Sequence, residues 1–357
     1  MKIVLTGGGT GGHIYPAISV GQALREIDPG IELLFVGSSH GPEGSIARES
    51  GIPFQAVPSA PLTKSVSLKN MSSFGKLLAG VFRARRILKD FGPDVVIGTG
   101  GYTTASVLVA ARTLALKIVI HEQNTIPGRT NRWLSHIADK VCISFDSSSS
   151  FFPKEKVILT GLPIRTEFGS LPGKNEARKM LSLKQDAFTI LVVGGSQGAK
   201  RLNELVFDMW PKINDGNTQI LHQVGQRNYE ESKSAESDDY HVRAYLDMPQ
   251  SVAAADLVIC RSGASTIAEI TAAGLPSILV PYPHAVSDEQ RHNAEYLADH
   301  NAGIVCDEFS LTSDILAGFV SDIRSSPDKL QKMADASASL AKIDAAKSVA
   351  QTAIGTT

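Results

Sequence analysis

Cysteines are scarce in this sequence, and those present are far apart. The three cysteines among the 357 residues are Cys142, Cys260 and Cys306. An odd number at these separations forms neither a disulfide framework nor the spacing of a metal site. Free thiols are typical of proteins in a reducing compartment. The cysteines therefore argue against a disulfide-stabilised secreted domain and against a cysteine-ligated metal centre.

Long hydrophobic runs are missing as well. The longest stretch without Asp, Glu, Lys, Arg or His, residues 95–111, is interrupted by glycines and threonines and falls short of a membrane span. Residues 1–5 lead directly into a glycine turn, without the longer apolar stretch and cleavage site of a signal peptide. We therefore expect a cytosolic protein that does not cross a membrane.

The sequence has no excess of either charge. Its 35 Lys and Arg and 36 Asp and Glu leave a net charge of −1, which argues against a nucleic-acid-binding field over the whole protein. Hydrophobic residues make up 43% of the chain, enough for a sizeable core. The length suits two domains of ordinary size.

Short β-branched runs alternate with longer amphipathic stretches along the chain. Such alternation predicts parallel sheets with helices on both faces. Helical patterns cover residues 16–26 and 74–91. The runs predicted to form buried strands in the first half are residues 3–5, 32–36, 95–97, 117–120 and 141–143.

The second half of the chain begins like the first. Residues 189–193 lead into the glycine turn 194–198, much as residues 3–6 lead into the turn 7–11. This weak repeat predicts an α/β protein of two doubly wound, Rossmann-like domains. We place them at residues 1–162 and 163–339, with a C-terminal helix at about 340–357 that packs back on the first domain.

The first glycine turn, residues 7–13, lies between a predicted strand and a predicted helix. Glycines let the backbone approach a phosphate, and helix N–H groups then point at it. The alternative is a tight turn without a ligand. The turn also matches the dinucleotide fingerprint, but residues 35–39 lack the acidic residue that holds a ribose. His13 ends the turn and is a candidate functional residue.

Two further polar segments follow predicted strands. Residues 98–102 read Gly-Thr-Gly-Gly-Tyr, and residues 121–124 read His-Glu-Gln-Asn. Ligands of open α/β sheets bind outside the carboxyl ends of the strands. The four grouped polar side chains could bind a hydroxyl-rich substrate, and one of them could accept a proton. The alternative is an ordinary loop whose histidine has an internal partner.

A third segment, residues 261–269, follows the predicted strand 257–260. Thr266 and Glu269 have the spacing of a helix capping box. Alternatively, the helix N-terminus binds a diphosphate and Glu269 binds ribose hydroxyls. Gln290 and Asn293 lie one helical turn apart on a later helix.

A basic and apolar stretch precedes residue 90. Residues 50–89 contain no Asp or Glu, and apolar side chains recur at helical spacing. Either this helix buries its apolar face in the core, or the stretch docks on an anionic membrane surface. The candidate membrane patch consists of Lys69, Phe74, Lys76, Leu77, Leu78, Val81, Phe82, Arg83, Arg85 and Arg86.

Several motifs together resemble the MurG family of peptidoglycan N-acetylglucosaminyltransferases, which make lipid II from lipid I. They occur in the family's order and are spread over most of the chain. They are Gly-Gly-Thr-Gly-Gly-His (8–13), Gly-Gly-Tyr (100–102), His-Glu-Gln-Asn (121–124), Gly-Gly-Ser-Gln-Gly-Ala (194–199), Cys-Arg-Ser-Gly-Ala (260–264) and Ala-Ala-Gly-Leu-Pro (272–276).

The resemblance implies a GT-B fold, in which two domains face a central cleft. It also implies an inverting, metal-independent transfer without a cofactor, from UDP-N-acetylglucosamine (UDP-GlcNAc) to the 4-hydroxyl of the N-acetylmuramic acid (MurNAc) of lipid I. The chain lacks the D-x-D motif of metal-dependent glycosyltransferases of the other common architecture. The implied location is the inner face of an anionic bacterial plasma membrane, as a peripheral protein that can contact other cell-wall synthesis enzymes.

Roles carry over from the family by position. His13 is the first candidate for the catalytic base and Glu122 the second. Tyr245 replaces an aliphatic residue of the family, and the contact expected at Ser265 is made by backbone. The resemblance assigns acceptor binding to Tyr102, His121 and Gln123. It assigns donor binding to Thr10, Gly11, Gly12, Asn124, Arg165, Ser196, Tyr245, Ala264, Ser265, Thr266, Glu269 and Gln290.

Three other functions remain as alternatives at this stage. A different GT-B glycosyltransferase could act on a glycolipid or natural product. A nicotinamide-dependent oxidoreductase would use the first glycine turn, although the missing acidic residue counts against it. A non-catalytic sensor would bind a nucleotide sugar without turning it over.

Overall fold

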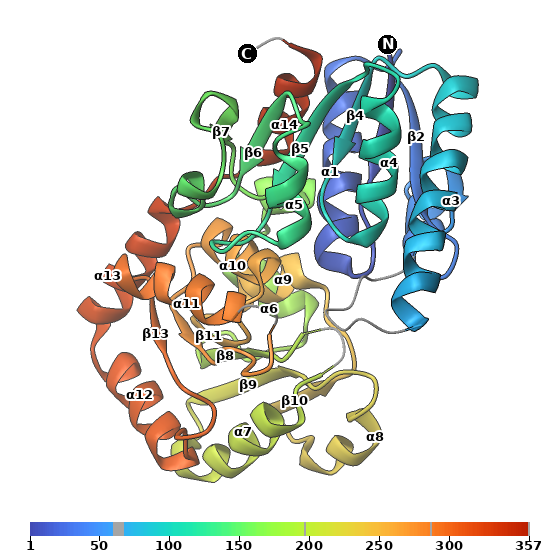
Figure 1. Cartoon of the computed structure of the whole chain (residues 1–357). Helices are drawn as coiled ribbons and strands as arrows, with labels where there is room; N and C mark the ends of the chain where they lie inside the picture. The colour runs from blue at the N-terminus through green and yellow to red at the C-terminus, as the bar shows by residue number, and fades with distance from the viewer. Residues whose placement is uncertain (60–67, 196–197, 286–287, 356–357) are drawn as a thin grey trace. The chain divides into compact units, whose positions relative to one another are not determined.

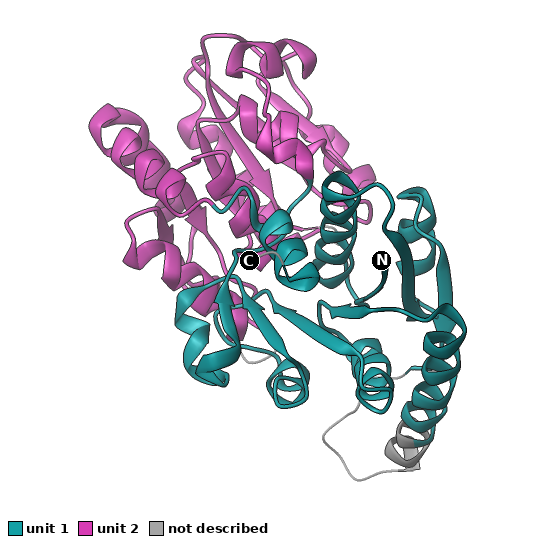
Figure 2. Ribbon diagram, turned by 90° about the horizontal axis from the view of Figure 1, so that it is seen from above, with its two compact units in different colours: residues 1–165, 342–357 teal, residues 166–341 magenta. Residues whose placement is uncertain are grey.

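The chain forms two compact units (Figure 2). The computed structural model describes residues 1–59, 68–195, 198–285 and 288–355, with the side chains of 68–74 left out. Unit 1 comprises Met1–Arg165 and Lys342–Thr357, and unit 2 comprises Thr166–Ala341. The chain therefore leaves unit 1 close to the boundary expected at residue 162 and returns to it for its last helix.

Unit 1 contains a seven-stranded parallel sheet in the order β3-β2-β1-β4-β5-β6-β7. The order reverses at β1, which places a topological switch point between β1 and β4. The strands are β1 (Lys2–Thr6), β2 (Glu32–Ser38), β3 (Phe54–Val57), β4 (Val95–Gly98), β5 (Lys117–Glu122), β6 (Lys140–Ile143) and β7 (Val157–Leu159).

Helices cover both faces of this sheet (Figure 1). Alternate residues of β1 explain the two layers, because Ile3 and Leu5 join the core under α1 and α14, whereas Val4 joins the core under α3 and α4. The helices are α1 (Gly11–Ile27), α2 (Glu43–Glu49), α3 (Leu68–Phe91), α4 (Tyr102–Arg112), α5 (Arg129–Leu134) and α14 (Ala345–Ile354), with 3₁₀ turns η1 (Asp146–Phe151) and η2 (Lys154–Lys156).

The last helix, α14, belongs to the core of unit 1. It packs along α1 (Figure 1), and its buried Val349 and Ala353 lie in the same cluster as Ile3. Lys117 of β5 donates to the carbonyl of Ala353 at 2.9 Å. The C-terminal helix therefore completes the fold that begins at residue 1.

Unit 2 contains a six-stranded parallel sheet in the order β10-β9-β8-β11-β12-β13. Its strands are β8 (Phe188–Val193), β9 (Thr218–Gln223), β10 (Tyr240–Arg243), β11 (Leu257–Cys260), β12 (Ser277–Leu279) and β13 (Gly303–Val305). Its helices are η3 (Thr166–Gly169), α6 (Lys174–Met180), α7 (Lys200–Ile213), α8 (Tyr229–Ser232), η4 (Lys233–Ala235), α9 (Met248–Ala254), α10 (Ala264–Ala272), α11 (Glu289–Asp299), α12 (Ser313–Ser325) and α13 (Pro327–Ser339).

The strands predicted in the first half are confirmed as β1, β2, β4, β5 and β6, and residues 189–193 lie in β8. Both predicted helices begin earlier than expected. The first starts at Gly11, so that Pro16 lies inside α1, and the second starts at Leu68. Within the described ranges, no helix is long and apolar enough to cross a lipid bilayer.

Candidate active site

The two glycine turns of unit 1 pack directly against each other. The amide of Gly8 donates to the carbonyl of Gly100 at 3.2 Å. Gly101 has a φ of 86°, and a Cβ at this position would lie 2.1 Å from the carbonyl oxygen of Gly8. Only glycine allows both this conformation and this close approach. The turns after β1 and β4 therefore form one site at the switch point.

Thr99 joins these turns to the first turn of α1. Its hydroxyl donates to the carbonyl of His13 at 2.6 Å, and its amide donates to Thr6 at 2.9 Å. Its carbonyl accepts from the ring of His13 and from the side chain of Gln123. Thr99 lies inside the Gly-Thr-Gly-Gly motif, but its position in the sequence does not indicate this role.

His13 is half-buried, and its ring is held by one nitrogen. The Nδ1 atom lies 3.1 Å from the carbonyl oxygen of Thr99 and 3.2 Å from Oε1 of Gln123. The ring rests on Gly100, where a Cβ would lie 3.1 Å from Nδ1. Burial lowers the pKa of His13, although the hydrogen bonds to Oε1 of Gln123 and to the carbonyl oxygen of Thr99 act to raise it. A neutral imidazole at pH 7 can accept a proton.

His121 and Gln123 point into unit 1 and are buried. The ring Nε2 of His121 lies 2.8 Å from the carbonyl oxygen of Gly161, and Nδ1 lies 3.3 Å from Nε2 of Gln123. Burial lowers the pKa of His121 to about 4. We had expected both side chains to bind an acceptor, yet the structure engages their polar atoms within the unit. The alternative of an internally paired histidine describes His121 better.

Glu122 is also buried, and both carboxylate oxygens accept hydrogen bonds. Oε1 accepts from the amide of Asn124 at 3.0 Å, and Oε2 accepts from the amide of Gly128 at 3.2 Å and the side chain of Asn131 at 2.9 Å. Burial raises the pKa of Glu122 to about 7, opposed by these donors. Glu122 thus holds the loop before α5 in place. His13 is better placed to act as a base, because Glu122 would first have to give up these bonds.

The remaining candidates of unit 1 surround the first turn. Thr10 is the N-cap of α1 in an extended conformation, and its side chain makes no capping hydrogen bond. Gly11 and Gly12 follow it, so their amides point outward from an uncapped N-terminus, as an anion site requires. The ring of Tyr102 lies beside Gly9, where a Cβ would come within 3.2 Å of it. Asn124 follows β5 and is half-buried.

Glu43 contributes to the site without any signal in the sequence. It is fully buried at the start of α2, and its Oε1 accepts from the amide of Gly9 at 3.0 Å. Its other oxygen is buried without a hydrogen-bond partner in the described part of the chain. A carboxylate held against the glycine turn fixes the path of its backbone.

In unit 2, α10 begins immediately after the carboxyl end of β11. Its N-cap is Gly263, which has no side chain to accept a capping hydrogen bond. Thr266 lies inside the helix, so the capping box suggested by its spacing from Glu269 is wrong. A capping box would require Thr266 to be the N-cap, but the helix already begins at Ala264. The backbone amides of Ala264, Ser265 and Thr266 form the first turn and lack helical acceptors.

The start of α11 is bound to the segment before α10. Ser262 donates from its hydroxyl to the carbonyl of Gln290 at 2.7 Å, and Asn293 donates to the carbonyl of Ser262 at 3.3 Å. The side chain of Gln290 accepts from the amide of Tyr282 at 3.0 Å. These bonds gather Gln290 and the first turn of α10 at one edge of the sheet. Among the other donor candidates, Glu269 is half-buried.

The last three donor candidates are distributed differently. Arg165 is the final residue of the first segment of unit 1 and is half-buried. Tyr245 follows β10 and is 57% exposed. Ser196 lies outside the described residues.

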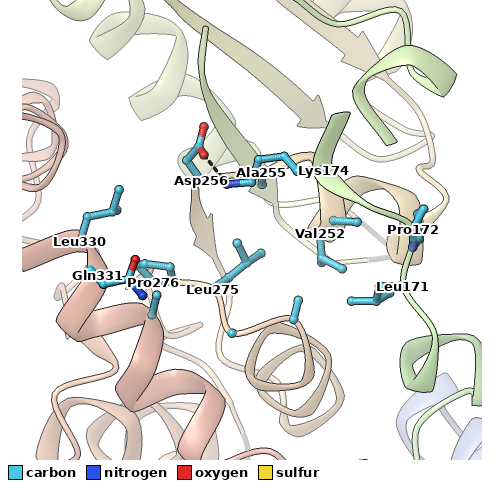
Figure 3. A pocket seen from close by; sticks show the side chains of 14 residues that line it. Leu171, Pro172, Lys174, Val252, Ala255, Asp256, Leu275, Pro276, Leu330 and Gln331 are labelled. Carbon is cyan, nitrogen blue, oxygen red and sulfur yellow. Dashed lines mark hydrogen bonds and ion pairs between the residues drawn. The ribbon is translucent and has the colours of Figure 1, made fainter. Parts of the chain in front are cut away.

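A hollow of unit 2 lies near the amino ends of β11 and β12 (Figure 3). It has a volume of about 290 Å³, and Asp256 and Pro276 at its wall precede β11 and β12. Lys174 reaches the carboxylate of Asp256 at 2.7 Å. The hollow is thus distant from the carboxyl ends, where ligands of such sheets bind. In the part of the chain that the structure describes, no group of three or more His, Cys, Asp or Glu could hold a metal ion.

Comparison with known proteins accounts for nearly the whole chain. Residues 3–143 match the glycosyltransferase family 28 N-terminal domain, and residues 189–350 match the glycosyltransferase family 28 C-terminal domain. A crystal structure of MurG from Acinetobacter baumannii superposes with a TM-score of 0.80 at 29% identity, covering 99% of each chain. The spinosyn rhamnosyltransferase SpnG superposes with a TM-score of 0.69 at 14% identity, which supports the GT-B fold alone.

Two curated relatives carry the same name, UDP-N-acetylglucosamine–N-acetylmuramyl-(pentapeptide) pyrophosphoryl-undecaprenol N-acetylglucosamine transferase. The protein of Geobacter sulfurreducens is 39% identical over 100% of this chain and 99% of its own length. That of Listeria monocytogenes is 39% identical over 97% of both. With this identity over the full length and both domains matched, the chain belongs to the MurG family of GT-B glycosyltransferases.

Proposed function

We propose that this chain transfers N-acetylglucosamine from UDP-GlcNAc to the 4-hydroxyl of MurNAc in a polyprenyl-pyrophosphoryl MurNAc-pentapeptide, converting lipid I to lipid II. The observation that carries the proposal is full-length identity of 39% to relatives named for this transfer. The site geometry supports it, because His13 stands at the switch point where sheets of this kind bind ligands.

The reaction is a direct displacement with inversion. The acceptor's 4-oxygen forms a bond to the anomeric carbon of the donor sugar while the bond to the UDP oxygen breaks. The hydroxyl proton passes to Nε2 of His13, which is neutral at pH 7 because burial lowers its pKa. UDP leaves with its electron pair as an anion.

The leaving UDP is stabilised by backbone amides. The uncapped N-terminus of α10 presents Ala264, Ser265 and Thr266 to its diphosphate, and helix dipoles favour negative charge there. Such preorganised donors lower the free energy of a transition state in which charge develops on the leaving group. Glu269 and Gln290 bind the uridine part, and Thr10, Gly11, Gly12 and Asn124 bind the sugar and its phosphate.

The acceptor's lipid requires a membrane surface, and α3 has the chemistry for one. Ala84, Ile87 and Leu88 face the core, whereas Phe82 is 72% and Leu78 45% exposed. The two outward apolar residues are one helical turn apart and share a patch. The exposure of these two residues favours docking over the alternative, in which the apolar face of the helix lies in the core.

Cations surround this outer apolar pair. Lys76, Arg83 and Arg86 are exposed, and each can add about 1 kcal/mol of attraction to an anionic surface. Arg85 instead donates to the carbonyl of Thr113 at 2.9 Å and supports the contact between α3 and α4. Leu77 and Val81 are half-buried, and the side chains of Lys69 and Phe74 lie outside the described part. We propose that α3 holds the protein on the inner face of the plasma membrane.

A donor screen tests the proposed reaction. The full chain is mixed with a short-chain lipid I analogue and each of several UDP-sugars, with and without EDTA, and UDP release and product are measured. We expect transfer from UDP-GlcNAc, with a β-linked product, at the same rate in EDTA. Faster transfer of another sugar, or an absolute need for a divalent cation, would contradict the proposal.

A further inference from the structure

A continuous chain of hydrogen bonds leads from the interior of unit 1 to His13. It begins at the carbonyl oxygen of Gly161, which lies 2.8 Å from Nε2 of His121. A carbonyl oxygen can only accept, so Nε2 of His121 must carry the hydrogen. The buried imidazole is neutral at pH 7, because burial lowers its pKa to about 4. Its Nδ1 therefore has no hydrogen and is an acceptor.

This acceptor determines which way the amide of Gln123 points. The Nε2 of Gln123 lies 3.3 Å from Nδ1 of His121, 3.2 Å from the carbonyl oxygen of His121 and 2.5 Å from that of Thr99. All three partners accept hydrogen bonds, so the amide nitrogen, and not the oxygen, must occupy this place. Oε1 of Gln123 is consequently directed toward His13.

The orientation of the amide determines where His13 carries its proton. Its Nδ1 faces two acceptors, Oε1 of Gln123 at 3.2 Å and the carbonyl oxygen of Thr99 at 3.1 Å. Nδ1 must therefore be the protonated nitrogen. In a neutral imidazole the other nitrogen then has the lone pair.

We propose that Gln123, held by His121, is a positioning residue that keeps His13 in the tautomer protonated on Nδ1, so that Nε2 is free to take the acceptor's proton. This inference rests on the proposed function only for the use of the tautomer in catalysis. The tautomer itself follows from the hydrogen bonds. The two groups that accept the hydrogen bond from Nδ1 of His13 are uncharged. An amide and a backbone carbonyl take the place of the carboxylate that orients many catalytic histidines. His121 and Gln123 thus act through His13 rather than on the substrate.

The tautomers can be read directly in the full-length protein. Long-range ¹H–¹⁵N NMR spectra of protein labelled with ¹⁵N-histidine distinguish the protonated from the bare ring nitrogen. The signals of His13 are identified by their loss in His13→Ala. We expect protonated Nδ1 in His13 and protonated Nε2 in His121. Protonation of His13 on Nε2 in the unmodified protein would overturn the inference.

A matched pair of variants links the tautomer to turnover. Gln123→Met removes the amide but keeps the length of the side chain. We expect mixed tautomers at His13 and kcat lowered at least about tenfold, with KM for UDP-GlcNAc changed by less than about twofold. The control is Gln219→Met, which removes a buried amide that donates to the carbonyl of Lys184 at 2.8 Å in unit 2. It should lose stability and keep both kcat and the tautomer of His13.

The outcomes separate this inference from the proposed function. An unchanged tautomer and kcat in Gln123→Met would contradict the inference, as would equal losses of kcat in both variants. If Gln123→Met does not fold, the spectrum of the unmodified protein still decides. Failure to transfer N-acetylglucosamine with His13 protonated on Nδ1 would reject the function and leave the tautomer standing.

Discussion

At the scale of single residues, the candidate site depends on positions without side chains. A Cβ at Gly7 would lie 2.1 Å from the hydroxyl oxygen of Thr99 and 2.6 Å from the carbonyl oxygen of His13. Gly100, with a φ of 101°, lies against the ring of His13. These glycines let Thr99 and His13 approach the backbone closely, which explains why the turns are so rich in glycine.

His13 should matter for turnover far more than for nucleotide binding. We expect His13→Ala to lower kcat roughly 100- to 10,000-fold, because a positioned general base contributes about that much. UDP affinity, measured by calorimetry, should stay nearly the same. The exposed His300 provides the control, since His300→Ala should alter neither. Full turnover in His13→Ala would remove this residue from the chemistry.

Glu269 should matter for nucleotide binding. Because the structure excludes the capping box, we assign its carboxylate to ribose hydroxyls. We expect Glu269→Gln to weaken UDP binding about tenfold, the loss of a charge-assisted hydrogen bond. Glu295→Gln on α11 is the control. A lower melting temperature with unchanged UDP affinity would instead make Glu269 a structural residue.

At the scale of secondary-structure elements, helix ends and helix faces have separate tasks. The uncapped starts of α1 and α10 offer backbone amides to anions. The outer face of α3 offers apolar side chains and cations to a membrane. Neither task requires the element to leave its place in the core, because other residues of each helix are buried.

The outer face of α3 can be tested with lipid vesicles. We expect the double variant Leu78→Ser/Phe82→Ser to bind anionic vesicles at least about tenfold more weakly, since burying one large apolar side chain contributes about 1.5–3 kcal/mol. Binding of the unmodified chain should also weaken with salt. Ile315→Ser, which removes an apolar side chain 46% exposed on α12, is the control. Equal binding by both variants would argue against docking through α3.

The contribution of α14 to unit 1 can be tested on one helix. Val349 is fully buried in the core cluster that also contains residues of α1 and β1, whereas Lys347 two residues earlier is exposed. We expect Val349→Asp to lower the free energy of unfolding by about 4 kcal/mol, because it buries an unpaired charge in the core. Lys347→Asp should have little effect. Chemical denaturation measures both, and equal small effects would mean that α14 adds little to stability.

At the scale of the whole molecule, buried histidines and the buried carboxyl of Glu122 respond to acid in opposite directions. His222 lies in the core of unit 2 between Tyr240 and Asn203, and burial lowers its pKa to about 3. Below pH 6.5 the unfolded chain therefore takes up a proton that the folded chain refuses, and stability falls. Glu122, with a pKa raised to about 7, contributes stability that is lost as the pH rises.

A variant separates the contribution of His222 to the pH dependence of stability from that of Glu122. Between pH 7 and pH 5, His222 should cost the folded protein about 2 kcal/mol of stability. We expect His222→Gln to lose that much less than the unmodified protein over this range. Glu122 is present in both proteins and cancels from the comparison. His300→Gln is the control, and the same pH dependence in His222→Gln and the unmodified protein would show that His222 is protonated when folded.

The sequence alone predicted the two parallel sheets and most of their strands. Apolar runs such as residues 3–5 and 117–120 predict these strands, because a strand that is covered on both faces of its sheet has a continuous apolar sequence. The order of the glycine and polar motifs was sufficient to indicate the family. The recurrence of a strand and a glycine turn at residue 189 also predicted that there are two Rossmann-like domains.

Only the tertiary structure decided how the pieces meet. The contact of Gly8 with Gly100, and the inward direction of His121 and Gln123, follow from placing β4 between β1 and β5. The outward direction of Phe82 and the start of α10 at Ala264 depend in the same way on neighbours distant in the chain. Periodicity reports which residues are apolar, but the strand order determines which polar groups face each other, and that order is a property of non-local contacts.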